Sequence, residues 1–68
     1  MFREYDIFTL AKQIPGEDIP VGARGVVLMV FTEPRRAYEV EFVDANGRNL
    51  GSRATFTLNE EYMMPLPG

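Results

Sequence analysis

The strongest constraint on the fold is the spacing of short apolar stretches between residues that favour turns. Five stretches rich in β-branched and aromatic residues are separated by clusters of Gly, Pro, Asn and Asp. No segment keeps the helical period of about 3.6 residues. Short strands joined at short intervals by turn residues are typical of a small all-β barrel or sandwich. We therefore expect an all-β fold of about five strands.

The first expected strand and the loop after it lie in residues 5–23. Residues 5–11 alternate weakly, which predicts an edge strand with Phe8 and Leu10 on one face. Residues 12–23 contain two prolines and two glycines, which exclude a regular element and predict a long loop. Three apolar side chains of this loop are expected to fold back onto the core: Ile14, Ile19 and Val21.

Residues 24–31 are the most apolar run and predict a central strand. Gly25 is expected to mark a bulge or a close approach of another group to the backbone. Strict alternation makes both faces apolar, with Val26, Leu28 and Val30 on one and Val27, Met29 and Phe31 on the other. Such a strand either curls around the core or turns its outer face to a partner. Residues 32–36 are expected to form a short loop.

Residues 37–57 predict a hairpin whose register follows from its turn. A three-residue loop, Ala45-Asn46-Gly47, with Gly47 in the left-handed conformation, preserves the alternation of the flanking residues. It implies these pairs: Asp44–Arg48, Phe42–Leu50, Val40–Ser52, Tyr38–Ala54 and, on the opposite face, Glu39–Arg53. The side chains expected in the core are Tyr38, Val40, Phe42 and Leu50, and those expected in water are Glu39, Glu41 and Arg53.

The last expected elements are a single turn and a short strand. Asn59 is a good capping residue, and the acidic residues after it favour one turn of 3₁₀ helix that ends at Tyr62. Residues 63–66 are expected to add a closing edge strand, where Pro65 is tolerated because an edge residue needs no donor on its outer side.

The order of these elements resembles that of an SH3-like barrel. Residues 20–27, 37–48 and 56–58, followed by Pro65-Leu66, resemble the bacterial family catalogued as domain of unknown function 4926. The resemblance spans nearly the whole chain. It implies one SH3-like domain over residues 1–68 and brings no catalytic residue or cofactor. Members are often described beside small toxin-like or uncharacterised genes, which suggests an antitoxin or immunity role by analogy alone.

The composition excludes most enzyme classes. Among 68 residues there is no Cys and no His, so a thiol nucleophile, a thiolate zinc site and the usual neutral-pH base are missing. Ser52 is the only serine and has no His partner. Glu39 and Glu41 lie two apart on one strand face, near Asp44, a spacing that suits acid–base catalysis or the binding of a hard cation. We interpret these carboxylates as part of a charged outer face. We therefore expect a protein that is not an enzyme and needs no cofactor or metal.

The preferred hypothesis is a protein-interaction module. Ten acidic residues against seven basic ones give a net charge of −3, which disfavours nucleic acid and would steer a basic protein partner. Self-association is the other partner that we expect. The contact surface is expected on the apolar outer face of the central strand, the loop after it and the closing strand: Val27, Met29, Phe31, Arg35, Arg36, Tyr62 and Met63.

The alternative hypothesis is a nucleic-acid-binding barrel. Arg35 and Arg36 would contact phosphates, and Phe31 and Tyr38 would stack on bases. Neither hypothesis places the protein in a membrane, because no apolar run approaches about 18 residues. Residues 1–6 lack the layout of a signal peptide, so a cytoplasmic location is expected.

Overall fold

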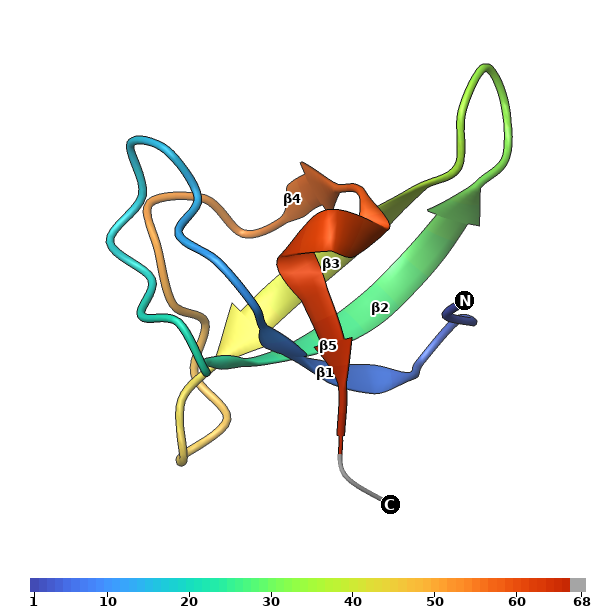
Figure 1. Ribbon diagram of the computed structural model, residues 1–68. Helices are drawn as coiled ribbons and strands as arrows, with labels where there is room; N and C mark the ends of the chain where they lie inside the picture. The colour runs from blue at the N-terminus through green and yellow to red at the C-terminus, as the bar shows by residue number, and fades with distance from the viewer. Residues whose placement is uncertain (67–68) are drawn as a thin grey trace.

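The computed structural model describes residues 1–66, which form one five-stranded antiparallel sheet in the order β4-β3-β2-β1-β5. Its elements are β1 (Ile7–Leu10), β2 (Arg24–Phe31), β3 (Ala37–Val43), β4 (Phe56–Leu58), the 3₁₀ helix η1 (Glu60–Tyr62) and β5 (Met63–Pro65). The sheet curls around the core, and η1 lies between its two edges (Figure 1). The expected all-β fold with a 3₁₀ turn before the last strand is confirmed. The single-domain prediction also covers residues 67 and 68, which lie outside the described residues.

The core is built around four phenylalanines in edge-to-face contact. Phe8 lies between Phe2 and Phe42, with ring centroids 6.0 and 5.6 Å apart, and Phe42 continues to Phe56 at 5.7 Å. Tyr38 packs against Phe2 and is fully buried. The expected burial of Tyr38 and Phe42 is thus confirmed, whereas no sequence pattern had placed Phe2 in the core.

A bulge in β2 changes which of its side chains face the core. Val27 pairs with Val40, but the next pair is Met29 with Glu39, so Leu28 is the extra residue. Beyond this bulge the alternation is reversed, which turns Met29 outward and leaves Val27 fully buried. The prediction that Val27 shares an outer face with Met29 and Phe31 is therefore wrong.

The close approach expected at Gly25 is confirmed. Gly25 pairs with Phe8 on β1, and a Cβ atom at this position would lie 2.4 Å from Phe8 Cζ. The phenylalanine ring therefore occupies the space that any larger residue would need.

The hairpin follows the expected register only near its turn. Gly47 has φ +79°, the Asp44 amide donates to the Arg48 carbonyl at 2.8 Å, and the Leu50 amide donates to the Phe42 carbonyl at 2.9 Å. Residues 51–55 then loop out. The ladder resumes with the pairs Val40–Phe56, Glu39–Thr57 and Tyr38–Leu58.

The pairs predicted for Ser52, Arg53 and Ala54 are therefore wrong. The original register would have turned Ser52 and Ala54 toward the core, whereas the loop brings Phe56 and Leu58 there, and both are buried. Burial of two large apolar side chains outweighs an unbroken hairpin. Gly51, at φ +92°, makes the departure from the ladder.

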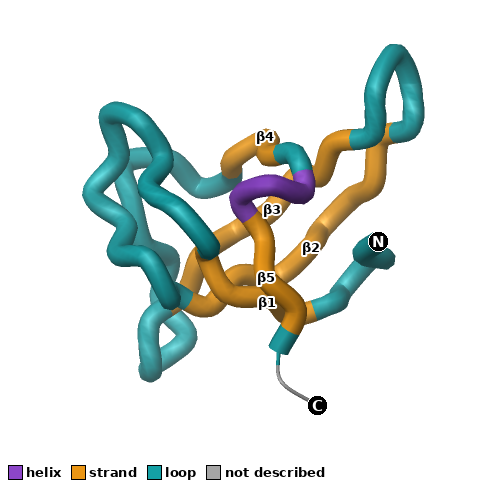
Figure 2. Tube along the Cα trace, in the orientation of Figure 1, coloured by secondary structure: helices purple, strands orange, loops and turns teal. Residues whose placement is uncertain are grey.

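Two loops pack against each other on the left of Figure 2. In the loop over residues 11–23, Ile19 is buried and Ile14 packs against the core, as expected, but Val21 is 57% exposed, so that expectation is wrong. The Ser52 hydroxyl donates to the Glu17 carboxylate at 3.0 Å and ties the loop over residues 44–55 to the first loop. No helix within residues 1–66 is long and apolar enough to cross a membrane.

The 3₁₀ turn and the closing strand form where the sequence predicts them. The Asn59 side chain accepts a hydrogen bond from the Glu61 amide at 2.9 Å, as a capping residue does. Met63, Met64 and Pro65 then pair with β1. β1 therefore lies between β2 and β5, and the prediction that it is an edge strand is wrong.

Candidate interaction surface

The outer half of β2 is paired along one side only. On its other side, Arg24 to Val26 pair with β1, and Val27 exchanges two hydrogen bonds with the N-terminal segment: the Tyr5 amide donates to the Val27 carbonyl at 2.6 Å, and the Val27 amide donates to the Asp6 carbonyl at 2.9 Å. Within residues 1–66, Met29 to Phe31 pair with β3 alone, and Leu28 is the unpaired residue of the bulge. Figure 1 shows this half of β2 extending beyond β1. We call residues 28–31 the open edge.

The ladder geometry shows which backbone groups face the open edge. The Phe42 carbonyl accepts from Leu50 and so points toward β4. In an antiparallel ladder, the backbone amides and carbonyls of successive residues point alternately to the two sides of the strand. The backbone groups of Glu39 and Ala37 therefore point toward β2 and bond to their ladder partners, Met29 and Phe31. Val30, between these two partners, turns its amide and its carbonyl away from β3. The open edge thus offers one donor and one acceptor, the pair that an added strand requires.

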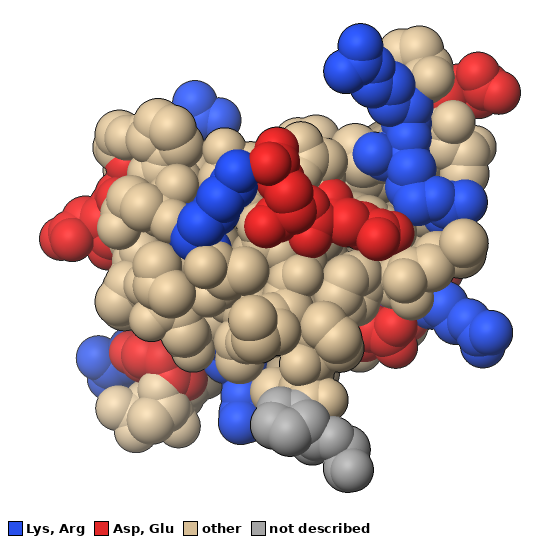
Figure 3. All heavy atoms as spheres, in the orientation of Figure 1, with Lys and Arg blue, Asp and Glu red and all other residues tan. Residues whose placement is uncertain are grey.

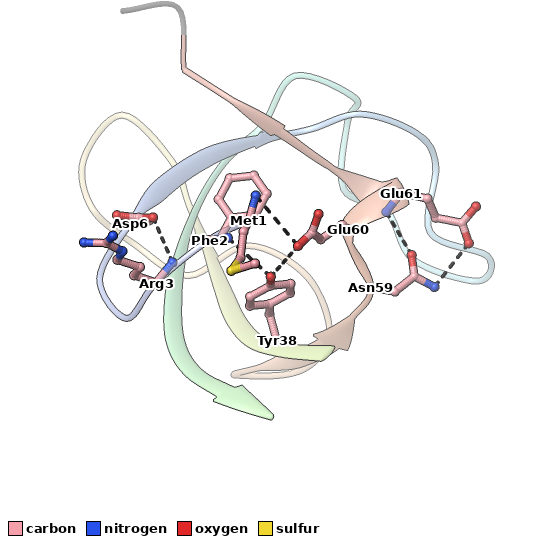
Figure 4. A network of polar contacts seen from close by, with 8 residues as sticks. All are labelled: Met1, Phe2, Arg3, Asp6, Tyr38, Asn59, Glu60 and Glu61. Carbon is pink, nitrogen blue, oxygen red and sulfur yellow. Dashed lines mark hydrogen bonds and ion pairs between the residues drawn. The ribbon is translucent and has the colours of Figure 1, made fainter. Parts of the chain in front are cut away.

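A turn in the N-terminal segment keeps this edge open. Tyr5 has φ +69°, which diverts the chain so that residues 1–4 do not extend β1 along the open edge. The turn is closed by two hydrogen bonds. The Arg3 amide donates to the Asp6 carboxylate at 2.8 Å (Figure 4), and the Asp6 amide donates to the Arg3 carbonyl at 3.1 Å. Phe2 is thereby carried into the core.

Two of the predicted contact residues, Met29 and Phe31, flank Val30 in the open edge. Met29 is 50% exposed and Phe31 is 37% exposed, both on the outer face of the sheet. Arg35 and Arg36 are exposed in the following loop, at residues 32–36. The structure therefore brings these four side chains to one end of the molecule, with Val30 as the residue that the sequence analysis missed.

The other predicted contact residues do not join this surface. Met63 is 6% exposed and Val27 fully buried, so neither side chain is available to a partner, because both belong to the core. Tyr62 is half-buried on η1, with the Lys12 ammonium 4.7 Å from its ring centroid. Figure 1 shows η1 well separated from the outer end of β2.

Tyr38 connects three parts of the fold. Its buried hydroxyl donates to the Glu60 carboxylate at 2.6 Å and accepts from the Phe2 amide at 3.3 Å (Figure 4). Burial raises the pKa of Tyr38 most, and the hydrogen bond to Glu60 raises it further. Hydrogen bonds with the Phe2 amide and Arg36 lower the pKa by smaller amounts. Because this side chain is fully buried, the prediction that it stacks on a nucleic-acid base is wrong.

Charges of both signs lie on the face that carries η1. Figure 3 shows acidic side chains gathered over η1 and basic side chains over the loop between β2 and β3. Lys12 Nζ lies 2.6 Å from the Glu61 carboxylate; this hydrogen bond lowers the pKa of Glu61 and raises that of Lys12. The acidic side chains of η1 thus already have partners within the chain.

Two of the three carboxylates considered for catalysis or metal binding have other roles. Glu39 accepts hydrogen bonds from the hydroxyls of Thr55 and Thr57, the second at 2.7 Å. Asp44 accepts from the backbone amides of Asn46 and Arg48 and so stabilises the hairpin turn. The part of the chain that the structure describes contains no group of three or more acidic residues placed to hold a metal ion.

Replacing Tyr38 with phenylalanine tests its connecting role. We expect the free energy of unfolding to fall by about 1–2 kcal/mol at neutral pH, because the Phe2 amide and Glu60 lose their shared partner. The folded state raises the pKa of Tyr38, so its contribution is complete below about pH 10 and declines as the pH rises through the folded-state pKa. Urea unfolding of both proteins from neutral to alkaline pH measures this. A difference that grows above about pH 10 would contradict it.

The fold and the surface define a small antiparallel β domain with an open strand edge. The model of a family described as a domain of unknown function, DUF4926, matches residues 4–65, and the chain belongs to this family. This confirms the resemblance noted from the sequence. No curated protein and no solved structure matches the chain.

Proposed function

We propose that this protein is a non-enzymatic interaction module, an SH3-like barrel that receives an extended segment of a partner protein along the open edge. The observation that carries this proposal is the position of Val30: the ladder turns its amide and carbonyl away from β3, neither has a partner within residues 1–66, and the exposed Met29 and Phe31 lie on either side. An added strand would satisfy both backbone groups, and its alternate side chains would cover the two apolar ones.

The partner that fits best is a basic protein with an apolar extended segment. Apolar side chains on that segment match Met29 and Phe31, and the net charge of −3 accelerates encounter with a basic molecule. An antitoxin, an immunity protein or an accessory subunit in the cytoplasm is the class of role that this describes.

Nucleic-acid binding has weaker support. Arg35 and Arg36 remain exposed, but Tyr38 is unavailable, which leaves Phe31 as the aromatic side chain beside them. Binding to single strands needs a positively charged groove with several stacking platforms. The face in Figure 3 instead carries both signs of charge.

Peptides selected from a random display library against the purified protein test the proposal. Val30→Pro removes the amide that faces the open edge, and Val30→Ala, which also lacks the valine side chain, keeps it. We expect Val30→Pro to weaken binding of the selected peptides about tenfold or more relative to Val30→Ala. A loss of this size corresponds to one well-made backbone hydrogen bond.

The spectra of both variants would first establish that they are folded; proline is tolerated at a strand edge where no donor is needed. Equal peptide binding by the two variants would overturn the proposal. A second result would also overturn it: the protein retains single-stranded RNA at physiological salt, and replacing Arg35 and Arg36 with alanine abolishes that binding. This outcome would assign the surface to nucleic acid.

A further inference from the structure

We infer that the open edge also pairs with the same edge of a second copy of this chain, antiparallel about a twofold axis at Val30. The inference rests on the proposed function, since both use the same backbone groups. It assigns a particular occupant to the edge when no other partner is present.

The backbone geometry is self-complementary. With the axis at Val30, the amide of each Val30 donates to the carbonyl of Val30 of the partner subunit, so two hydrogen bonds satisfy the open amide and carbonyl of both copies. Closely spaced hydrogen bonds of this kind are made by directly opposed residues in an antiparallel pair. Symmetric pairing of identical surfaces is also the commonest way in which homodimers form.

The side chains beside Val30 are complementary in the same register. Met29 lies opposite Phe31 of the partner subunit, and Phe31 lies opposite Met29 of the partner subunit. These are the two exposed apolar side chains on the outer half of β2, and each gains a cross-strand neighbour. A thioether beside an aromatic ring is a favourable contact. The twofold pair therefore covers the whole apolar surface at the open edge.

The charges at the two ends of the pair are of opposite sign. The loop over residues 32–36 of one copy extends toward the turn over residues 3–6 of the other, which occupies the same edge beside Val27. The loop carries two arginines and one glutamate, a net charge of +1; the turn carries one arginine, one glutamate and one aspartate, a net charge of −1. The attraction acts twice because of the symmetry.

The other exposed edges of the sheet fit a second copy less well. β4 and β5 have three residues each, and β5 contains Pro65, which lacks an amide. The turn at Tyr5 limits the pairing between the two copies to about residues 28–32 of each, so the interface is smaller than that of a standard stable complex. We therefore expect a weak dimer, from which a better-matched strand displaces one copy.

Sedimentation equilibrium from about 10 µM to about 1 mM, the range in which so small an interface dissociates, tests the inference. The expected mass rises from 7.7 kDa toward twice that value with concentration. Val30→Pro should weaken dimerisation about tenfold or more relative to Val30→Ala. Phe31→Ala, at an exposed side chain, should weaken it as well and provides a second variant if Val30→Pro does not fold.

The contact itself is tested by nuclear Overhauser effects in a mixture of differently labelled copies. We expect a signal between the Met29 methyl group of one copy and the Phe31 ring of the other. A protein that stays monomeric at about 1 mM overturns the inference, and so does a dimer whose intermolecular signals come from Ile7, Met64 or Leu66. If the protein is monomeric while peptide binding still depends on the Val30 amide, the dimer fails and the proposed function stands.

Discussion

Replacing Phe42 with alanine is expected to remove most of the folding stability of this protein. Phe42 is fully buried, and its ring contacts those of Phe8 and Phe56 at 5.6 and 5.7 Å between centroids. Truncating a buried phenylalanine costs about 3–5 kcal/mol, because the surrounding side chains collapse only partly into the cavity. At about 0.05–0.15 kcal/mol per residue, a chain of this length has only about 3–10 kcal/mol in all.

Phe31→Ala is the matched control, since it makes the same chemical change at a side chain that is 37% exposed. We expect it to cost less than about 1 kcal/mol. Urea unfolding followed by circular dichroism measures both. Equal losses in the two variants would show that Phe42 does not hold the place in the core that the aromatic contacts give it.

Much of this fold could be predicted because local residues determine it. The turn at Gly47 needs a left-handed residue after Asn46, and the 3₁₀ turn begins at a side chain that caps it. Both depend on neighbours within a few positions. The bounds of β2 likewise follow from an unbroken apolar run between Arg24 and Phe31.

The features that could not be predicted depend on distant parts of the chain. The loop over residues 51–55 forms because it places Phe56 and Leu58 in the core in place of Ser52 and Ala54. The alternation of residues along the hairpin does not show which of these two pairs is buried. The bulge at Leu28 has no glycine to mark it. Without that bulge, Val27 and Met29 would have shared one face of the strand.

The candidate site shows the same division. Exposure of Met29 and Phe31 could be anticipated from a strand that is apolar on both faces. The open edge could not be anticipated, because it depends on where the pairing of β1 with β2 stops. The left-handed conformation of Tyr5 determines that point, and tyrosine seldom adopts this conformation. Sequence patterns identify side chains more readily than they identify unpaired backbone groups.

Replacing Gly25 with alanine is expected to destabilise the protein by about 1–3 kcal/mol, although alanine loses less backbone entropy on folding. Its Cβ would lie 2.4 Å from Cζ and 2.6 Å from Cε1 of Phe8. The ring has little room to move, because Phe2 and Phe42 pack against it. The strain therefore has to be taken up by the pairing of β1 with β2.

A double-mutant cycle with Phe8→Leu separates this contact from the other effects of a glycine substitution. Leucine removes the ring atoms that the new Cβ would meet, so the alanine should cost at least about 1 kcal/mol less in the Phe8→Leu protein than in the original one. Urea unfolding of the four proteins measures the coupling. If the stability losses of the two single substitutions add up in the double variant, glycine is required by the strand itself. If the double variant loses less than their sum, glycine is required by the Phe8 ring, and packing of the core determines the residue at this position of the strand.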